Sequence, residues 1–256
     1  MKKKLFLVPI MAMFAVVSMA QVDFQLHYDL GRNINPESES NRQKVTSTVE
    51  MYHPDATGST YFFVDMDYFS DGLGAAYWEV SREFTLANLK NSNFAAHIEY
   101  DGGLTVNKYT PQYANRYQQC FLVGPAYNWH NANFSKTFSV QAMLKQYIKK
   151  DNLKGITSFQ LTGVWSTTFA KGLCTFSGFA DLWYGYTPRY DDNGSQKKGW
   201  VFITEPQFWF NIVGKDRQHG KFSIGTEWEL SNDFIWATNS KKTFFFNPTI
   251  AAKYVF

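Results

Sequence analysis

Several features that define common protein classes are scarce in this sequence. Its only cysteines, Cys120 and Cys174, fall in predicted strands that are not neighbours, on phases that hold their side chains apart, so we favour free thiols over a disulfide. Beyond the N-terminus no stretch approaches the roughly 20 apolar residues of a spanning helix. No basic stripe indicates nucleic-acid binding, and no Cys/His cluster or glycine-rich loop has the spacing of a metal or cofactor site. We therefore expect no nucleic-acid partner, no metal and no cofactor.

The first 20 residues are predicted to be a signal peptide. Three lysines at positions 2–4 precede a short apolar core, and residues 18–20 are the small residues that a signal peptidase recognises. Residues 21–256 then form one exported domain without a linker or an internal repeat. The sequence holds 25 Lys and Arg residues against 22 Asp and Glu residues. Because three of the lysines lie in the signal peptide, the exported part is close to neutral.

Alternation of apolar and polar residues dominates the rest of the chain, whereas helical periodicity is nearly absent. A period of two is typical of β-strands, whose successive side chains point to opposite faces. The first such segment has Val22, Phe24, Leu26, Tyr28 and Leu30 on one face and Asp23, Gln25, His27 and Asp29 on the other. About twelve segments long enough to cross a bilayer as tilted strands are predicted. They cover residues 22–32, 44–52, 60–70, 75–85, 94–101, 117–127, 134–148, 156–169, 172–186, 199–213, 220–230 and 243–256.

The connections and the last segment favour a barrel in the outer membrane. Turns after even-numbered segments are short, whereas the loops after odd-numbered segments include the longest, 33–43, 102–116, 187–198 and 231–242. This asymmetry is typical of outer-membrane barrels with both termini in the periplasm. The last segment has apolar residues at alternate positions and ends with Phe256. Such an ending resembles the signal that the outer-membrane assembly machinery reads.

These patterns predict an all-β fold: a transmembrane, antiparallel, up-and-down β-barrel of about twelve strands in the outer membrane of a Gram-negative bacterium. The lumen of such a barrel is too wide for side chains to fill with apolar groups. The apolar phase must therefore face outward, against the outer-membrane lipid. Closure also leaves no unpaired strand edge in the hydrocarbon. The polar phase then lines an aqueous interior.

The inward phase is rich in acids and also carries aromatic rings. Its clear bases are only Lys145 and Lys253, so the lumen should disfavour anions and admit cations or neutral polar solutes. Rings beside carboxylates can hold a planar solute with hydroxyl groups, because rings stack on its face and carboxylates accept its hydrogen bonds. Alternatively, the rings only fill the lumen and brace the wall. The candidate pore-lining residues are Asp65, Asp67, Tyr77, Glu79, His97, Glu99, Asp181, Trp183, Glu205, Trp209 and Glu227.

A family resemblance begins at residues 61–89, which read YFFVDMDYFSDGLGAAYWEVSREFTLANL. This stretch, with an aromatic and acidic strand, a glycine-containing loop and a second strand with Trp, Glu and Phe, resembles the Tsx-like nucleoside-specific channel-forming proteins of Gram-negative outer membranes. The segments GFADLWYGY (178–186) and VFITEPQFWFN (201–211) are similar to another branch of that superfamily. The resemblance implies a monomeric twelve-stranded barrel with a narrow, nucleoside-selective pore. By position, the resemblance implies a pore-lining role for Asp65, Asp67, Tyr77, Glu79, Asp181, Trp183, Glu205 and Trp209. His97, Glu99 and Glu227 are candidates because of their strand phase alone.

The expected function is passive uptake of small polar solutes, nucleoside-like ones above all. The alternative is a barrel without a transport role that is structural or binds an envelope partner, with residues 234–236 as its candidate apolar contact. An enzyme is not expected. The arrangement that would suggest one is His97 with Ser81 and Glu99, a possible set for nucleophilic catalysis.

Overall fold

Strands occupy most of the chain because the alternating segments pair with one another. The computed structural model describes residues 21–86, 93–106, 114–151, 153–213, 222–236 and 241–256, so the predicted signal peptide lies outside the described residues. The elements are β1 (Gln21–Asp29), α1 (Gly31–Ile34), β2 (Val45–Asp55), β3 (Gly58–Phe69), β4 (Gly72–Thr85), β5 (Phe94–Val106), β6 (Ala114–Arg116), β7 (Cys120–His130), β8 (Lys136–Tyr147), β9 (Thr157–Phe169), β10 (Cys174–Tyr190), β11 (Gln196–Thr204), β12 (Gln207–Val213), β13 (Phe222–Asn232) and β14 (Phe244–Val255). Among these described residues, no helix is long and apolar enough to cross a membrane.

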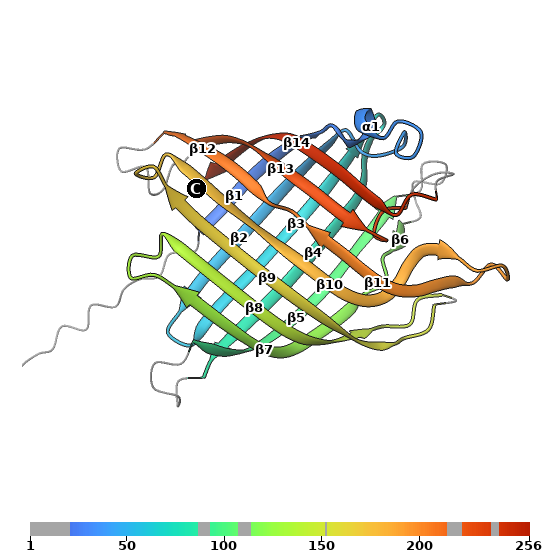
Figure 1. The fold of residues 1–256 in the computed structure, drawn as a ribbon, viewed down its shortest axis with the longest axis horizontal. Coiled ribbons are helices and arrows are strands. Elements are labelled where there is room, and N and C mark those ends of the chain that lie inside the picture. The colour runs from blue at the N-terminus through green and yellow to red at the C-terminus, as the bar shows by residue number, and fades with distance from the viewer. Residues whose placement is uncertain (1–20, 87–92, 107–113, 152, 214–221, 237–240) are drawn as a thin grey trace, which may run out of the picture.

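The strands form one closed antiparallel barrel (Figure 1). Closure is made by β1, which pairs with β2 on one side and with β14 on the other. The short β6 and β7 both pair with β5, and β11 and β12 follow one another between β10 and β13. When β6 with β7 and β11 with β12 are each counted as one wall strand, the described residues form a twelve-stranded barrel. This confirms the predicted fold class.

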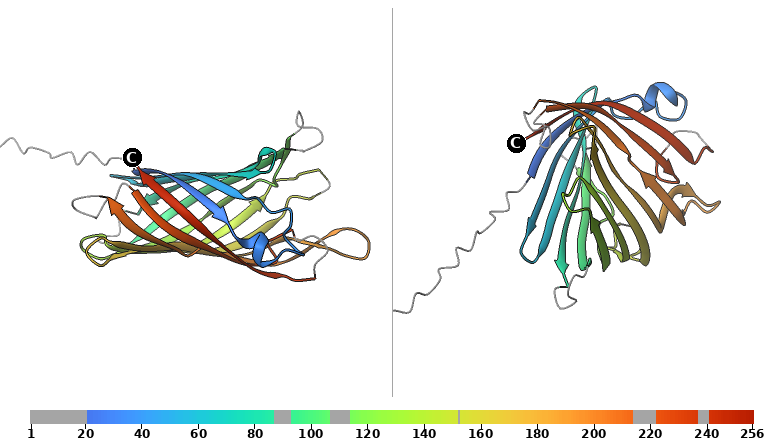
Figure 2. Two further views of the ribbon diagram at one scale, coloured as in Figure 1. Left: turned by 90° about the horizontal axis from the view of Figure 1, so that it is seen from above. Right: turned by 60° about the vertical axis from the view of Figure 1, so that its left-hand side comes forward.

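The two ends of the barrel differ in their connections. At one end, which we call the turn end, Ala56 and Thr57 alone join β2 to β3, and residues 170–173 join β9 to β10. The chain's last strand also ends there, beside the start of β1, since Asp23 pairs with Val255 (Figure 2). At the opposite end, the loop end, α1 and residues 35–44 join β1 to β2. The predicted contrast between short turns and a long first loop is confirmed.

Several predicted strand boundaries at the loop end were wrong. The segment 187–198 is mostly strand, because β10 continues to Tyr190 and β11 starts at Gln196, and the resulting hairpin projects from the barrel (Figure 1). In the same way β5 extends to Val106. These strand extensions lack the alternation of apolar and polar residues from which the other strand boundaries were predicted. The first strand, in contrast, ends early at Asp29, whose Oδ1 accepts a hydrogen bond of 2.8 Å from the Gly31 N–H before α1.

The predicted strand 199–213 is interrupted in the structure. Pro206 has no N–H to donate to the ladder, and regular pairing stops between β11 and β12. On the neighbouring β10, Gly178 has φ +151°, and a Cβ added there would lie 2.5 Å from the Glu205 carbonyl oxygen. The break therefore depends on both a proline and a glycine, on adjacent strands.

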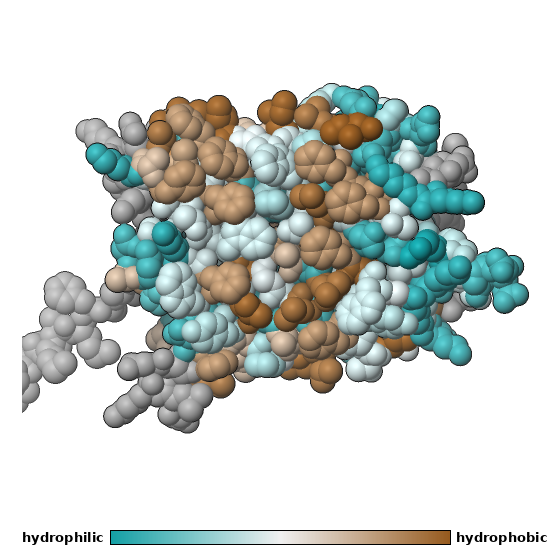
Figure 3. Space-filling view, viewed as in Figure 1, coloured by the Kyte–Doolittle hydropathy of each residue, from teal (hydrophilic) through white to brown (hydrophobic). Residues whose placement is uncertain are grey.

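The two faces of the wall have the predicted polarity. Side chains such as Leu26 (46% exposed), Leu144 (59%) and Ile250 (63%) point outward. On the face shown in Figure 3, apolar residues cover much of the middle of the wall, and hydrophilic residues gather towards the loop end. Facing inward are polar side chains such as Gln25, His27 and Asn247, which are at most 3% exposed. Both cysteines are free, as predicted.

Candidate functional site

The barrel encloses a cavity of about 2180 Å³. Its wall includes Gln21 and Ser59 at the turn end and Asp71 and Thr105 at the loop end, so the cavity follows the length of the barrel. Fourteen carboxyl side chains but only five lysine or arginine side chains line it, among the residues that the structure describes. The inward phase of the strands therefore produces an aqueous interior with an excess of negative charge.

Ten of the eleven candidate residues lie on this wall. They are Asp65, Asp67, Tyr77, Glu79, His97, Glu99, Asp181, Trp183, Glu205 and Glu227. Trp209 also points inward from β12 but is fully buried, with Lys253 Nζ 4.2 Å from its ring centre and the His27 ring packed against it. Its Nε1 donates a hydrogen bond of 2.9 Å to Gln207 Oε1. Ten side chains are thus placed to meet a solute, and their role in binding stays a prediction.

His97 lies between two carboxylates rather than beside a nucleophile. Its Nδ1 is 3.2 Å from Glu83 Oε1, and its Nε2 is 3.1 Å from Glu99 Oε2. Ser81 sits across from Glu99 in the β4–β5 register. Because the carboxylates occupy both ring nitrogens, neither is left to accept a proton from the Ser81 hydroxyl. This arrangement does not supply the base that nucleophilic catalysis requires.

A compact acidic group lies on β4 and β5. Oxygen atoms of Glu79, Glu99 and Asp101 lie within 4.8 Å of one another, close enough for a hard cation such as Ca²⁺. Lys145 Nζ, however, lies 3.3 Å from Asp101 Oδ2 and 2.7 Å from Gln160 Oε1. The group therefore already has a cationic neighbour, and the expectation that no cofactor is needed stays a prediction.

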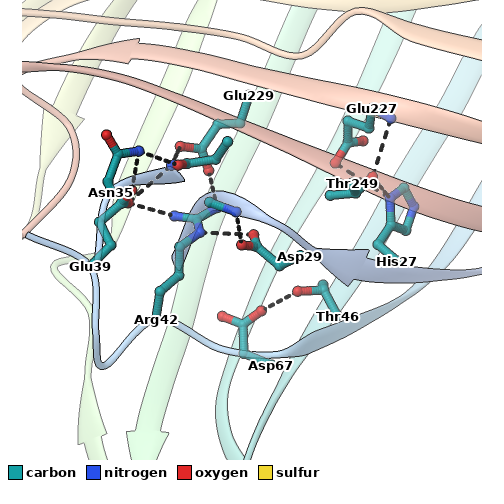
Figure 4. Close-up of polar contacts among 12 residues, drawn as sticks. His27, Asp29, Asn35, Glu39, Arg42, Thr46, Asp67, Glu227, Glu229 and Thr249 are labelled. Carbon is teal, nitrogen blue, oxygen red and sulfur yellow. Dashed lines mark hydrogen bonds and ion pairs between the residues drawn. The ribbon is translucent and has the colours of Figure 1, made fainter. Parts of the chain in front are cut away.

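A polar network attaches the β1–β2 loop to the wall near the loop end (Figure 4). Arg42 donates hydrogen bonds of 2.8 Å both to Asp29 Oδ2 on β1 and to Glu229 Oε2 on β13, and it lies 3.5 Å from Glu39 Oε1. Asn247 on β14 donates to Glu39 Oε1 and to Glu229 Oε1, each at 3.0 Å. One loop is thus bonded to three strands, and Glu39 and Arg42 line the cavity.

Burial and charge act in opposite directions on the two loop residues of this network. Burial lowers the pKa of Arg42, but the carboxylates of Glu229 and Asp29 outweigh burial and hold it above its ordinary value. Burial raises the pKa of the Glu39 carboxyl, although Arg42 and the amide of Asn247 act against this. Arg42 is consequently a permanent positive charge among the acids of the cavity.

Comparison with known proteins places the chain in a family. A family model described as "Domain of unknown function (DUF5020)" matches residues 20–256. The chain belongs to the DUF5020 family. No curated protein matches it. The predicted Tsx-like family is not shown by these comparisons.

Solved structures resemble this DUF5020 chain only distantly. LpxR from Salmonella typhimurium aligns over 92% of this chain and 100% of its own, with 8% identity and a TM-score of 0.46. The β-domain of the Bordetella autotransporter BrkA covers 92% of this chain and 98% of its own, with 9% identity and a TM-score of 0.36. A bacterial polysaccharide outer membrane secretin covers 93% and 99%, with 10% identity and a TM-score of 0.39. Likenesses of this size carry no argument about function.

Arg42 and Tyr117 line the cavity of this DUF5020 chain but were not among the candidate residues. Arg42 lies in the loop between β1 and β2, and alternation has no information about a loop that folds back over the lumen. Tyr117 was placed at the start of the predicted strand 117–127, but β7 starts only at Cys120, so strand phase does not set the direction of the Tyr117 side chain. The single available signal for Arg42 is the opposite charge of Glu39 three residues earlier.

Proposed function

We propose that this protein is a channel in the outer membrane of a Gram-negative bacterium for the passive uptake of small polar solutes, nucleoside-like ones in particular. The observation that carries the proposal is the cavity of about 2180 Å³, whose wall reaches from the turn end to the loop end. In this proposal the barrel is a monomer that faces outer-membrane lipid, is inserted by the assembly machinery, and catalyses no reaction.

The negative charge of the wall supports a channel that admits cations and neutral solutes and disfavours anions. Carboxylates outnumber the lysines and arginines on the described part of the wall, and the exposed outer face is apolar. A ring of acids in a low-dielectric shell attracts cations and repels anions. Neutral solutes with hydroxyl groups can still donate hydrogen bonds to the carboxylates.

Aromatic rings within the same cavity support nucleoside-like solutes. Tyr77 and Trp183 lie on the wall with Glu79 and Asp181 two residues away on their own strands. Rings stack on a base, while carboxylates accept hydrogen bonds from its amino and hydroxyl groups. The resemblance of residues 61–89 to Tsx-like channels points to the same solutes.

Recording from the purified full-length barrel in planar bilayers tests the proposal. We expect cation-selective ion conductance that adenosine reduces, and entry of adenosine into liposomes that contain the protein. Conductance unchanged by any nucleoside would leave a general pore. Folded, inserted protein without conductance would overturn the channel function.

Exposed aromatic side chains at the loop end favour one alternative, a barrel that binds a protein partner without transport. Trp236 is 59% exposed and Tyr190 is 55% exposed, and their ring centres lie 5.8 Å apart beside a second cavity of about 910 Å³. Apolar groups exposed together are typical of contact surfaces. Absence of conductance together with a partner that co-purifies only when Trp236 and Tyr190 are intact would favour this reading.

A further inference from the structure

Four aromatic rings follow one another along one wall of the cavity. The ring centres of Tyr61 and Phe63 on β3 are 6.1 Å apart. Phe63 is 5.9 Å from Tyr77 on β4, and Tyr77 is 6.2 Å from Tyr117. All four line the cavity. Since β3 starts at the turn end and Tyr117 lies just before β7 at the loop end, this ring track runs along the barrel rather than around it.

The sequence places these rings by three separate means. Tyr61 and Phe63 share the inward phase of β3, and Tyr77 lies across from Asp65 in the β3–β4 register. The next residue along that row is Gly103 on β5. A Cβ added to Gly103 would lie 2.3 Å from Tyr117 Cδ2, so the absent side chain makes the room that Tyr117 occupies. The last ring of the track therefore depends on a glycine.

Carboxylates flank the track on both sides. In the strand register Phe63 lies between Glu50 on β2 and Glu79 on β4. Glu79 Oε1 accepts a hydrogen bond of 2.7 Å from the Tyr77 hydroxyl, which leaves its other oxygen for a further donor. All of these side chains also line the cavity. The wall thus offers ring faces at its centre and hydrogen-bond acceptors at its edges.

We infer that this ring track is the path along which the solute moves, and that it selects solutes with a flat face and hydroxyl or amino donors at the edge. The inference rests on the proposed channel function and specifies its site. A base or a sugar ring can pass from one aromatic face to the next, about 6 Å on, while its donors stay bonded to the flanking carboxylates. An acyclic polyol has the same hydroxyl donors but no flat face. The track therefore discriminates between ring-bearing and open-chain solutes of similar polarity.

Phe63→Leu tests the track because leucine keeps an apolar side chain but removes the aromatic face. Phe179→Leu is the matched control, since Phe179 lines the cavity from β10 and the described residues give it no ring contact. The measurements are the adenosine concentration that halves the ion current and the rates at which adenosine and ribitol enter liposomes. Heat-dependent gel mobility verifies that each barrel is folded.

We expect Phe63→Leu to raise the half-blocking adenosine concentration by about tenfold, which is what one lost stacking contact gives. Ribitol entry should stay within about twofold of the wild type, and Phe179→Leu should change neither value by more than this. If Phe63→Leu left the adenosine block unchanged, or changed adenosine and ribitol entry equally, the ring track would be overturned. The channel function would survive that result as long as the protein conducts ions. Wild-type protein without conductance would instead overturn the channel itself.

Discussion

Arg42 and Glu229 join a loop to a distant strand: the guanidinium Nη2 donates a hydrogen bond of 2.8 Å to Glu229 Oε2, although 187 residues separate them. The same guanidinium binds Asp29, whose side chain is only 3% exposed. The long β1–β2 loop is thereby fixed against the inside of the barrel near its loop end. The predictions below begin with this contact.

Arg42→Ala should release the β1–β2 loop from the wall. Removing one partner of a buried ion pair leaves the other charge without compensation, at a cost of about 3–5 kcal/mol. Here Asp29 and Glu229 would both lose their cation, so we expect faster amide exchange over residues 31–44 and a larger single-channel conductance. Arg32→Ala is the control, since Arg32 donates a 3.3 Å hydrogen bond to the Ser40 carbonyl and has no ion pair among the residues that the structure describes. Equal exchange and conductance in both variants would contradict the role given to Arg42.

Asp65→Asn together with Asp67→Asn should lower the preference for cations. Both carboxylates line the cavity on β3, and their loss removes two of its negative charges. Amides still accept the hydrogen bonds that Thr48 and Thr46 donate at 2.5 and 2.7 Å. In a salt gradient we expect the reversal potential to move towards zero. The control is Asp191→Asn with Asp192→Asn, in the turn of the projecting hairpin; a shift of the same size there would show that Asp65 and Asp67 do not control the ion path.

Gly178→Ala should destabilise the barrel at the break between β11 and β12. With φ at +151°, an added Cβ would lie 2.5 Å from the Glu205 carbonyl oxygen, which is a backbone atom and cannot easily move. Strain and overpacking of this kind cost about 1–3 kcal/mol each. Gly163→Ala is the comparison, because nothing lies within 4 Å of its added Cβ. Reversible urea unfolding in lipid vesicles should give a lower free energy of unfolding for the first variant only.

Leu26→Arg should destabilise the protein in lipid if the outer face meets hydrocarbon. Leu26 is 46% exposed on β1 and points away from the cavity. Arginine on the lipid face of a barrel costs about 2–4 kcal/mol near the bilayer midplane. Leu26→Phe keeps the position apolar and should unfold close to the wild type. Equal unfolding free energies for the two variants would mean that this face is not in contact with acyl chains.

Much of the architecture could be predicted because the alternation of side chains within a single β-strand shows which of them face inward and which face outward. Two consecutive residues of β1, Leu26 and His27, already show which face is outside, since one is 46% exposed and the other 3%. The same alternation placed ten of eleven candidate side chains on the cavity wall. The break at Pro206 was missed although the residue is visible, because the apolar pattern continues on both sides of it.

The sequence by itself determined the number of wall strands, their inward and outward faces and the acidic character of the interior. Those properties depend on a period of two, which each segment carries without reference to any other. Only the tertiary structure decided that Arg42 binds Glu229 and that Tyr117 lies over Gly103 to extend the ring track. Contacts of this kind depend on strand register and on how a loop folds back over the lumen, and both are fixed by residues far apart in the chain.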